Sequence, residues 1–82
     1  IWDTRSVTDM GFMFISASSF NQALAGWDTG SVINMYGMFF NASSFNQDVS
    51  SWCVDSIGWE PPLFDLNATA WVLPRPVWGT CP

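Results

Sequence analysis

A chain of 82 residues with a net charge of −5 is long enough for one small domain and too acidic to neutralise a nucleic-acid backbone. Two arginines are the only basic residues. The absence of lysine and histidine removes Schiff-base chemistry and the most common general base. No apolar stretch approaches the roughly 20 residues of a transmembrane helix, so we expect no membrane insertion.

The sequence repeats with a period of 25 residues. When residues 2–26 are aligned with residues 27–51, 14 of 25 positions are identical, and both copies contain the string ASSFNQ. Such a period is typical of arrays in which each unit buries its apolar face on the next. We assign residues 1–26 to repeat 1, 27–51 to repeat 2, and 52–82 to a degenerate repeat 3 with a C-terminal cap.

Within each repeat we predict one short helix and one short strand. In repeat 1, Ser6 and Asp9 have the spacing of a capping box, and apolar residues follow at helical spacing from Val7 to Ala17. Residues 20–24 then have the pattern of a short extended segment. The expected architecture is a right-handed coil with one strand and one helical turn per repeat.

Repeat 3 keeps the period only in part. Leu63 and Phe64 fall opposite Met38 and Phe39, and we place one inserted residue after them. Prolines and a second group of tryptophans then replace the polar ASSFNQ block. This end of the chain therefore has the composition of a cap.

A longer motif makes the repeat more specific. The pattern V-x-x-M-x-x-M-F-x-x-A-x-x-F-N-x-x-L-x-x-W-D begins at Val7 and, with small departures, again at Val32. It resembles the BspA-like, leucine-rich-repeat-related surface repeats, and the closing PVWGTCP resembles the C-terminal end of such an array. The resemblance implies an α/β fold, a right-handed leucine-rich-repeat-like solenoid, that is extracellular, secreted or cell-surface and serves adhesion or structure. It implies no catalytic residue and no cofactor.

The two cysteines, Cys53 and Cys81, flank repeat 3. We predict that they form a disulfide that staples the C-terminal cap; the alternative is a pair of free, buried thiols. Closing a loop of this length contributes about 3–4 kcal/mol in the chain-entropy model, and a disulfide implies an oxidising compartment. Two cysteines without a histidine are too few ligands for a zinc site.

Two N-glycosylation sequons begin at Asn41 and Asn67, at equivalent positions of consecutive repeats. We predict N-linked glycans there if the source is a eukaryotic secreted protein, and the prediction is much weaker for a bacterial source. The alternative is an unmodified asparagine that ends a helix, where this residue is favoured.

The repeat also places polar residues above one another. Asn21 and Gln22 would stack on Asn46 and Gln47. One interpretation is a binding ridge, and the other is an amide ladder that satisfies backbone groups between coils. We favour the ladder.

Four tryptophans align in register: Trp2, Trp27, Trp52 and Trp78. An exposed row of this kind could bind sugar rings, whereas a buried row would form the spine of the core. We favour the core, because burial of large apolar groups stabilises so small a domain. We expect Trp59 and Trp71 to plug the C-terminal end.

Metal and catalytic sites are not predicted. Five aspartates could be imagined as calcium ligands, but the sequence lacks an EF-hand pattern, and we interpret them as turn and cap carboxylates: Asp3, Asp28, Asp48, Asp55 and Asp65. No base is available to activate a serine, and nothing places two carboxylates in a cleft.

The sequence therefore predicts a non-enzymatic extracellular structural or adhesion module that acts by protein–protein association, as a glycosylated fibre or surface-coat subunit. The alternative is a carbohydrate- or receptor-binding module that uses the Asn/Gln and Trp faces. The chain begins at Ile1 without a signal peptide, so we expect a processed product or part of a longer polypeptide. We expect further repeats or other protein chains to cover the N-terminal coil, and a neighbouring copy there would give a homo-oligomer or filament.

Overall fold

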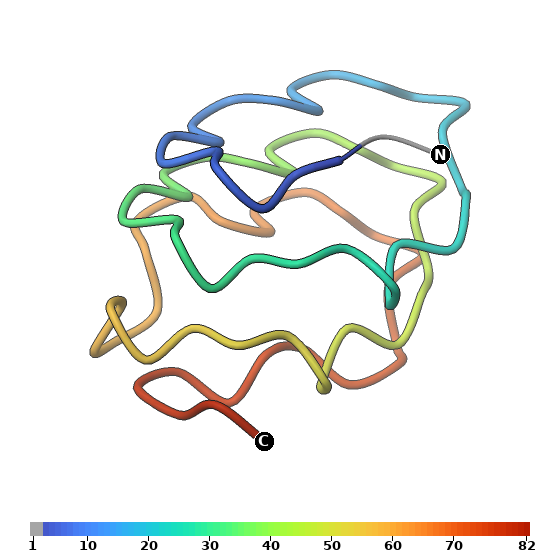
Figure 1. The fold of residues 1–82 in the computed structure, drawn as a ribbon. Coiled ribbons are helices and arrows are strands. Elements are labelled where there is room, and N and C mark those ends of the chain that lie inside the picture. Colours follow the sequence, from blue (N-terminus) through green and yellow to red (C-terminus); the bar gives the residue numbers. More distant parts are fainter. Residues whose placement is uncertain (1–2) are drawn as a thin grey trace.

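The computed structural model describes residues 3–82, which wind through stacked coils (Figure 1). The N-terminal coil forms one end of the stack and the C-terminal segment forms the other. The principal extents are 27 × 26 × 20 Å. Among these described residues there is no α-helix and no β-strand, and the only regular pairing is an isolated parallel bridge between Asp9 and Asn34.

The predicted α/β solenoid with one strand and one helix per repeat is therefore wrong. Residues 7–17 form no helix, because Phe12 and Ser16 adopt left-handed backbone conformations, with φ of 56° and 55°. The chain instead advances by consecutive tight turns, in which an N–H bonds the carbonyl three residues earlier, as from Met13 to Met10 and from Ala17 to Phe14. Apolar residues three or four apart fit such turns as well as they fit a helix.

The backbone groups that a helix would pair internally are paired between coils. The N–H groups of the first coil donate to carbonyls of the second at 2.8 Å: Met10 to Asn34, Phe12 to Tyr36, Phe14 to Met38, and Ser16 to Phe40. The second coil donates to the third in the same way: Gly37 to Pro62, Phe39 to Phe64, and Asn41 to Leu66. This ladder satisfies the buried main chain without forming a regular sheet.

Left-handed residues set the register of the third coil. Phe12, Gly37 and Leu63 share one such position, with φ of 56°, 59° and 60°, and they are separated by 25 and then 26 residues. Leu63 is thus equivalent to Gly37, and the predicted alignment of Leu63 with Met38 is wrong. Ile57 still makes the turn bond to the carbonyl three residues earlier that Val32 makes. Phe64 also bonds the carbonyl of Pro61 as Met38 bonds that of Met35, so the inserted residue lies within 58–60.

Stacked aromatic rings fill the interior. Phe39 stacks on Phe14, with ring centroids 5.3 Å apart, and on Phe45, with centroids 4.3 Å apart. Two tryptophans enter this column and use their indole N–H to bond a carbonyl of the preceding coil: Trp52 to Leu24 at 2.8 Å, and Trp71 to Gln47 at 2.9 Å. Each ring thus combines apolar burial with a satisfied polar atom.

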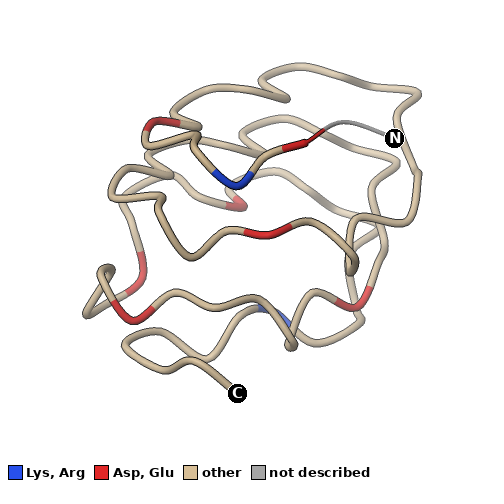
Figure 2. Cartoon of the chain, in the orientation of Figure 1, with Lys and Arg blue, Asp and Glu red and all other residues tan. Residues whose placement is uncertain are grey.

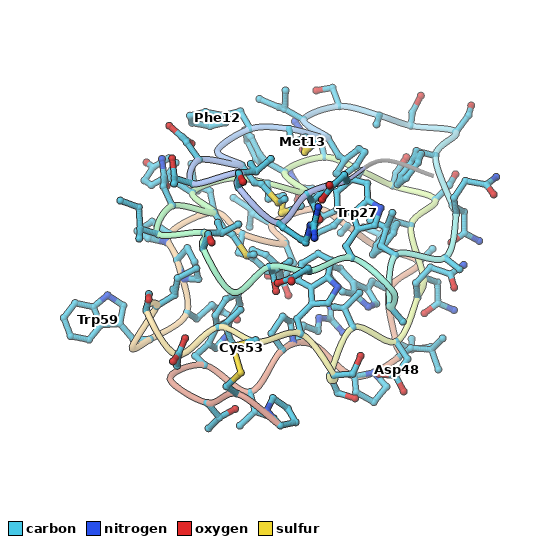
Figure 3. All side chains as sticks on the ribbon, viewed as in Figure 1. Phe12, Met13, Trp27, Asp48, Cys53 and Trp59 are labelled. Carbon is cyan, nitrogen blue, oxygen red and sulfur yellow. A yellow bond between two sulfur atoms is a disulfide. The ribbon has the colours of Figure 1, made fainter. Side chains whose placement is uncertain are left out.

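The C-terminal segment closes the far end of the stack. A disulfide joins Cys53 to Cys81, as predicted. Trp78 packs edge-on against Phe64, with centroids 4.8 Å apart. Trp71 is buried as expected, but Trp59 is 80% exposed and does not plug this end (Figure 3). The reason is that Trp59 falls in the insertion, where the chain bulges away from the stack.

Substitution of Gly37 by Ala should lower the free energy of unfolding by about 2 kcal/mol. A Cβ at position 37 would lie 2.5 Å from Cε1 of Phe12, and the left-handed backbone adds about 1 kcal/mol of strain. Gly26→Ala is the matched control, because no atom lies within 4 Å of the added Cβ. Urea denaturation measures both variants, and equal stability of the two would contradict the stacking of Phe12 on Gly37.

Loss of the disulfide in Cys81→Ser should lower the free energy of unfolding by about 3 kcal/mol, because the cross-link joins residues 28 apart and restricts the unfolded chain. Denaturation with and without reductant tests this. The reduced wild-type protein should match the variant; a reductant effect on the variant itself would point to another cause.

Candidate functional site

The first coil has an uncovered side, which we call the first-coil face: the side of residues 7–20 that points away from the second coil. Equivalent residues show how incomplete its burial is. Met13 is 39% exposed whereas Met38 is fully buried. Phe14 is half-buried, and its equivalent Phe39 is also fully buried. Since the residue types are identical, the difference arises because no coil among residues 3–82 covers this side, and it leaves apolar surface at this end (Figure 3).

The same face carries a row of backbone acceptors. In the second coil, the carbonyls of Asn34, Tyr36, Met38 and Phe40 accept N–H groups from the first coil. Their equivalents in the first coil are the carbonyls of Asp9, Gly11, Met13 and Ile15, to which none of residues 3–82 donates a hydrogen bond. The first-coil face is therefore an open edge with both apolar side chains and alternate carbonyl groups. The sequence suggested an uncovered coil but could not show which main-chain groups it exposes.

The predicted polar ridge makes an amide ladder in the structure. Oδ1 of Asn21 accepts hydrogen bonds from the N–H of Asn46 and from Nε2 of Gln47, both at 2.9 Å. Oδ1 of Asn46 accepts the N–H groups of residues 72 and 73, both at 3.0 Å. Gln22 is exposed beside this ladder. The amide oxygens therefore act between coils, which supports the structural interpretation over a binding ridge.

The predicted tryptophan row faces inward. Trp52 is buried, and Trp27 and Trp78 are half-buried against the core. Trp2 lies outside the described residues. The three members of the predicted row that the structure describes therefore form no exposed row of stacked indole rings. The exposed Trp59 lies at a different position of the repeat.

The two sequon asparagines contact each other. Both have left-handed backbones, with φ of 61° at Asn41 and 63° at Asn67, and they end turns instead of helices. Nδ2 of Asn67 donates to Oδ1 of Asn41 at 2.9 Å. Asn67 is exposed and Asn41 is half-buried, so a modifying enzyme would reach Asn67 more easily.

Acidic side chains are dispersed over the chain, with only two basic positions (Figure 2). The aspartates mostly hold turns: Asp9 accepts the N–H of Gly11 at 2.8 Å. Hydrogen bonds from the side chain and N–H of Ser50 lower the pKa of Asp48. Within residues 3–82 no three His, Cys, Asp or Glu side chains are grouped to hold a metal ion.

The model of one protein family, described as "Mycoplasma protein of unknown function, DUF285", matches residues 1–78. This match includes both complete repeats and most of the third. No curated protein and no solved structure gives a significant match. In the part of the chain that the structure describes, no helix is long and apolar enough to cross a membrane.

Replacement of Asn46 by Ala should lower the free energy of unfolding by about 0.5–1.5 kcal/mol, because two exposed N–H groups, at residues 72 and 73, exchange its amide oxygen for water. Asn46→Asp keeps an acceptor oxygen and should lose less. Gln22→Ala is the exposed control on the same face. Thermal and chemical denaturation compare the three; an Asn46→Ala variant as stable as Gln22→Ala would show that the ladder contributes nothing.

Proposed function

The chain belongs to the family described as "Mycoplasma protein of unknown function, DUF285", and from this premise we propose that it is a non-enzymatic, extracellular structural or adhesion module that acts by binding other protein chains. The observation that carries the proposal is the first-coil face. Its apolar side chains have fully buried equivalents one coil further along, as Met13 and Met38 illustrate. Exposed apolar surface next to an unpaired backbone edge is typical of protein interaction sites.

Two further observations support an extracellular, surface-associated role. The disulfide between Cys53 and Cys81 suits an oxidising compartment. The repeat pattern resembles that of BspA-like surface proteins, which serve adhesion or structure. N-linked glycans at Asn41 and Asn67 belong to this proposal only for a eukaryotic source.

A carbohydrate- or receptor-binding module is the second candidate. The exposed indole ring of Trp59 favours it, since aromatic rings stack on apolar faces of ligands. The inward position of Trp52 and the use of the Asn21 and Asn46 amides between coils count against it. Association through the first-coil face is therefore the better supported function.

Light scattering and sedimentation over a range of protein concentrations test the proposal. The first-coil face should give weak self-association, with a mass that rises above 9.1 kDa as concentration increases. Met13→Glu should weaken this association at least tenfold, because a carboxylate would have to be buried in the interface without a partner.

Ile33→Glu is the matched control. It introduces the same charge at an apolar residue of the second coil that is 68% exposed. A plateau at two chains would indicate that two first-coil faces meet, and continued growth would indicate a fibre. A wild-type chain that stays monomeric, or equal loss in both glutamate variants, would contradict the proposal.

A further inference from the structure

The disulfide between Cys53 and Cys81 can be reached from solvent (Figure 3). Cys53 is half-buried and Cys81 is exposed, as are all of residues 79–82. Two backbone hydrogen bonds join this segment to Val54, whose N–H donates to the carbonyl of Thr80 at 2.8 Å and whose carbonyl accepts the N–H of residue 79 at 3.2 Å. A small thiol can therefore approach the cross-link, and its reduction would remove the covalent attachment of the segment.

A carboxylate lies against this disulfide. Oδ1 of Asp55 is 3.5 Å from Sγ of Cys53. A disulfide sulfur carries no hydrogen, so this contact supplies no hydrogen bond to the carboxylate. Other aspartates stabilise turns, since Asp9, Asp28 and Asp48 each accept the N–H two residues later, at 2.8, 3.0 and 2.9 Å. Among residues 3–82 no N–H donates to the Asp55 carboxylate, so turn formation does not explain its position beside the sulfur.

The other charges near the cross-link are also negative. A Cβ built on Gly30 would lie 3.8 Å from Sγ of Cys53 and 3.2 Å from Oδ1 of Asp28, so a second carboxylate lies on the same side of the sulfur. The two arginines form ion pairs with other aspartates, at 2.8 and 2.9 Å, and the chain has no lysine or histidine. Reactive cysteines have electropositive surroundings, and this pair has the opposite.

Reduction by a small thiol requires two successive exchanges. In the first, the thiolate of the reagent bonds to one cysteine sulfur, and the other cysteine leaves as a thiolate that takes a proton from water. In the second, another reagent thiolate attacks the reagent sulfur of this mixed disulfide and releases the remaining cysteine. The reagent is thereby oxidised to its own disulfide, and the protein disulfide gains the two electrons. Attack at Cys53 brings the charge of the reagent beside Asp55, and attack at Cys81 expels Cys53 as a thiolate beside Asp55, so both routes place negative charge near the carboxylate.

We propose that the Asp55 carboxylate makes the Cys53–Cys81 cross-link selective for the charge of the reductant. Anionic thiols open it slowly, because their charge must approach Asp55, whereas cationic thiols open it faster. Residues 79–82 therefore stay attached in the presence of anionic thiols such as glutathione, and are released by thiols without a negative charge. This redox device is separate from the first-coil face, so the proposed function does not depend on it.

Reduction rates of the oxidised wild-type protein and of Asp55→Asn test this proposal. The reductants are anionic 2-mercaptoethanesulfonate, neutral 2-mercaptoethanol and cationic cysteamine, and alkylation followed by intact mass measures the released thiols. The substitution should speed reduction by the sulfonate about tenfold and by cysteamine less than about threefold, because charges in contact interact strongly at a protein surface. The neutral thiol should fall between them. The intrinsic reactivity of each thiol cancels, since the same reagent is compared between the two proteins.

Asp9→Asn is the matched control, because it makes the same exchange in the first coil and keeps an acceptor oxygen for the N–H of Gly11. It should change each rate less than about twofold, since salt screens distant charges. In the wild-type protein, an increase in ionic strength from about 0.01 to about 1 M should reduce the rate advantage of cysteamine over the sulfonate about threefold. Equal acceleration of all three thiols in Asp55→Asn would indicate easier access instead of charge and would overturn the proposal. Unchanged rates in that variant, an equal effect of Asp9→Asn, or a rate ratio independent of salt would overturn it as well.

Discussion

The backbone ladder between coils is the constraint on which the rest of the structure depends. Its hydrogen bonds join residues 24 to 26 apart, at the spacing that side-chain bonds between coils also show. Because these bonds replace the hydrogen bonds within a helix, each coil depends on its neighbour for partners to its backbone N–H and C=O groups. The aromatic column, the asparagine ladder and the buried threonines follow the same spacing. A change of register, such as the insertion at 58–60, therefore displaces every later position.

The repeat, the inward aromatic positions and the disulfide could be read from the sequence because each leaves a residue-type signal. The local backbone conformation could not be predicted from the sequence. The spacing of Val7, Met10 and Ala17 fits a helix and a series of turns equally well. The left-handed backbone at Phe12 and Ser16 makes this segment a series of turns and not a helix. Phenylalanine and serine rarely adopt this conformation, so the sequence does not indicate it. Only Gly37, at the equivalent place in the second coil, hints at this conformation.

From the sequence, the candidate site could be predicted only as an uncovered N-terminal coil. Which side of the first coil is open, and which carbonyl groups it presents, depends on the direction in which each coil donates. That direction is a property of the folded backbone and has no counterpart in residue identity. The tryptophan row, in contrast, could be predicted from the sequence. Its register follows from the repeat, and its inward orientation follows because a small domain must bury its large rings.

The stack has unequal neighbours at its ends, and this gives it unequal local stability. Among residues 3–82, the second coil is paired on both sides, the third is held by the disulfide, and the first is paired on one side only. Amide exchange with solvent should therefore be fastest in residues 3–20, where fraying costs the fewest contacts. A ligand that covers this coil would suppress its fraying and raise the stability of the whole chain by mass action. The most labile part of the molecule would thus also be the part through which binding stabilises it.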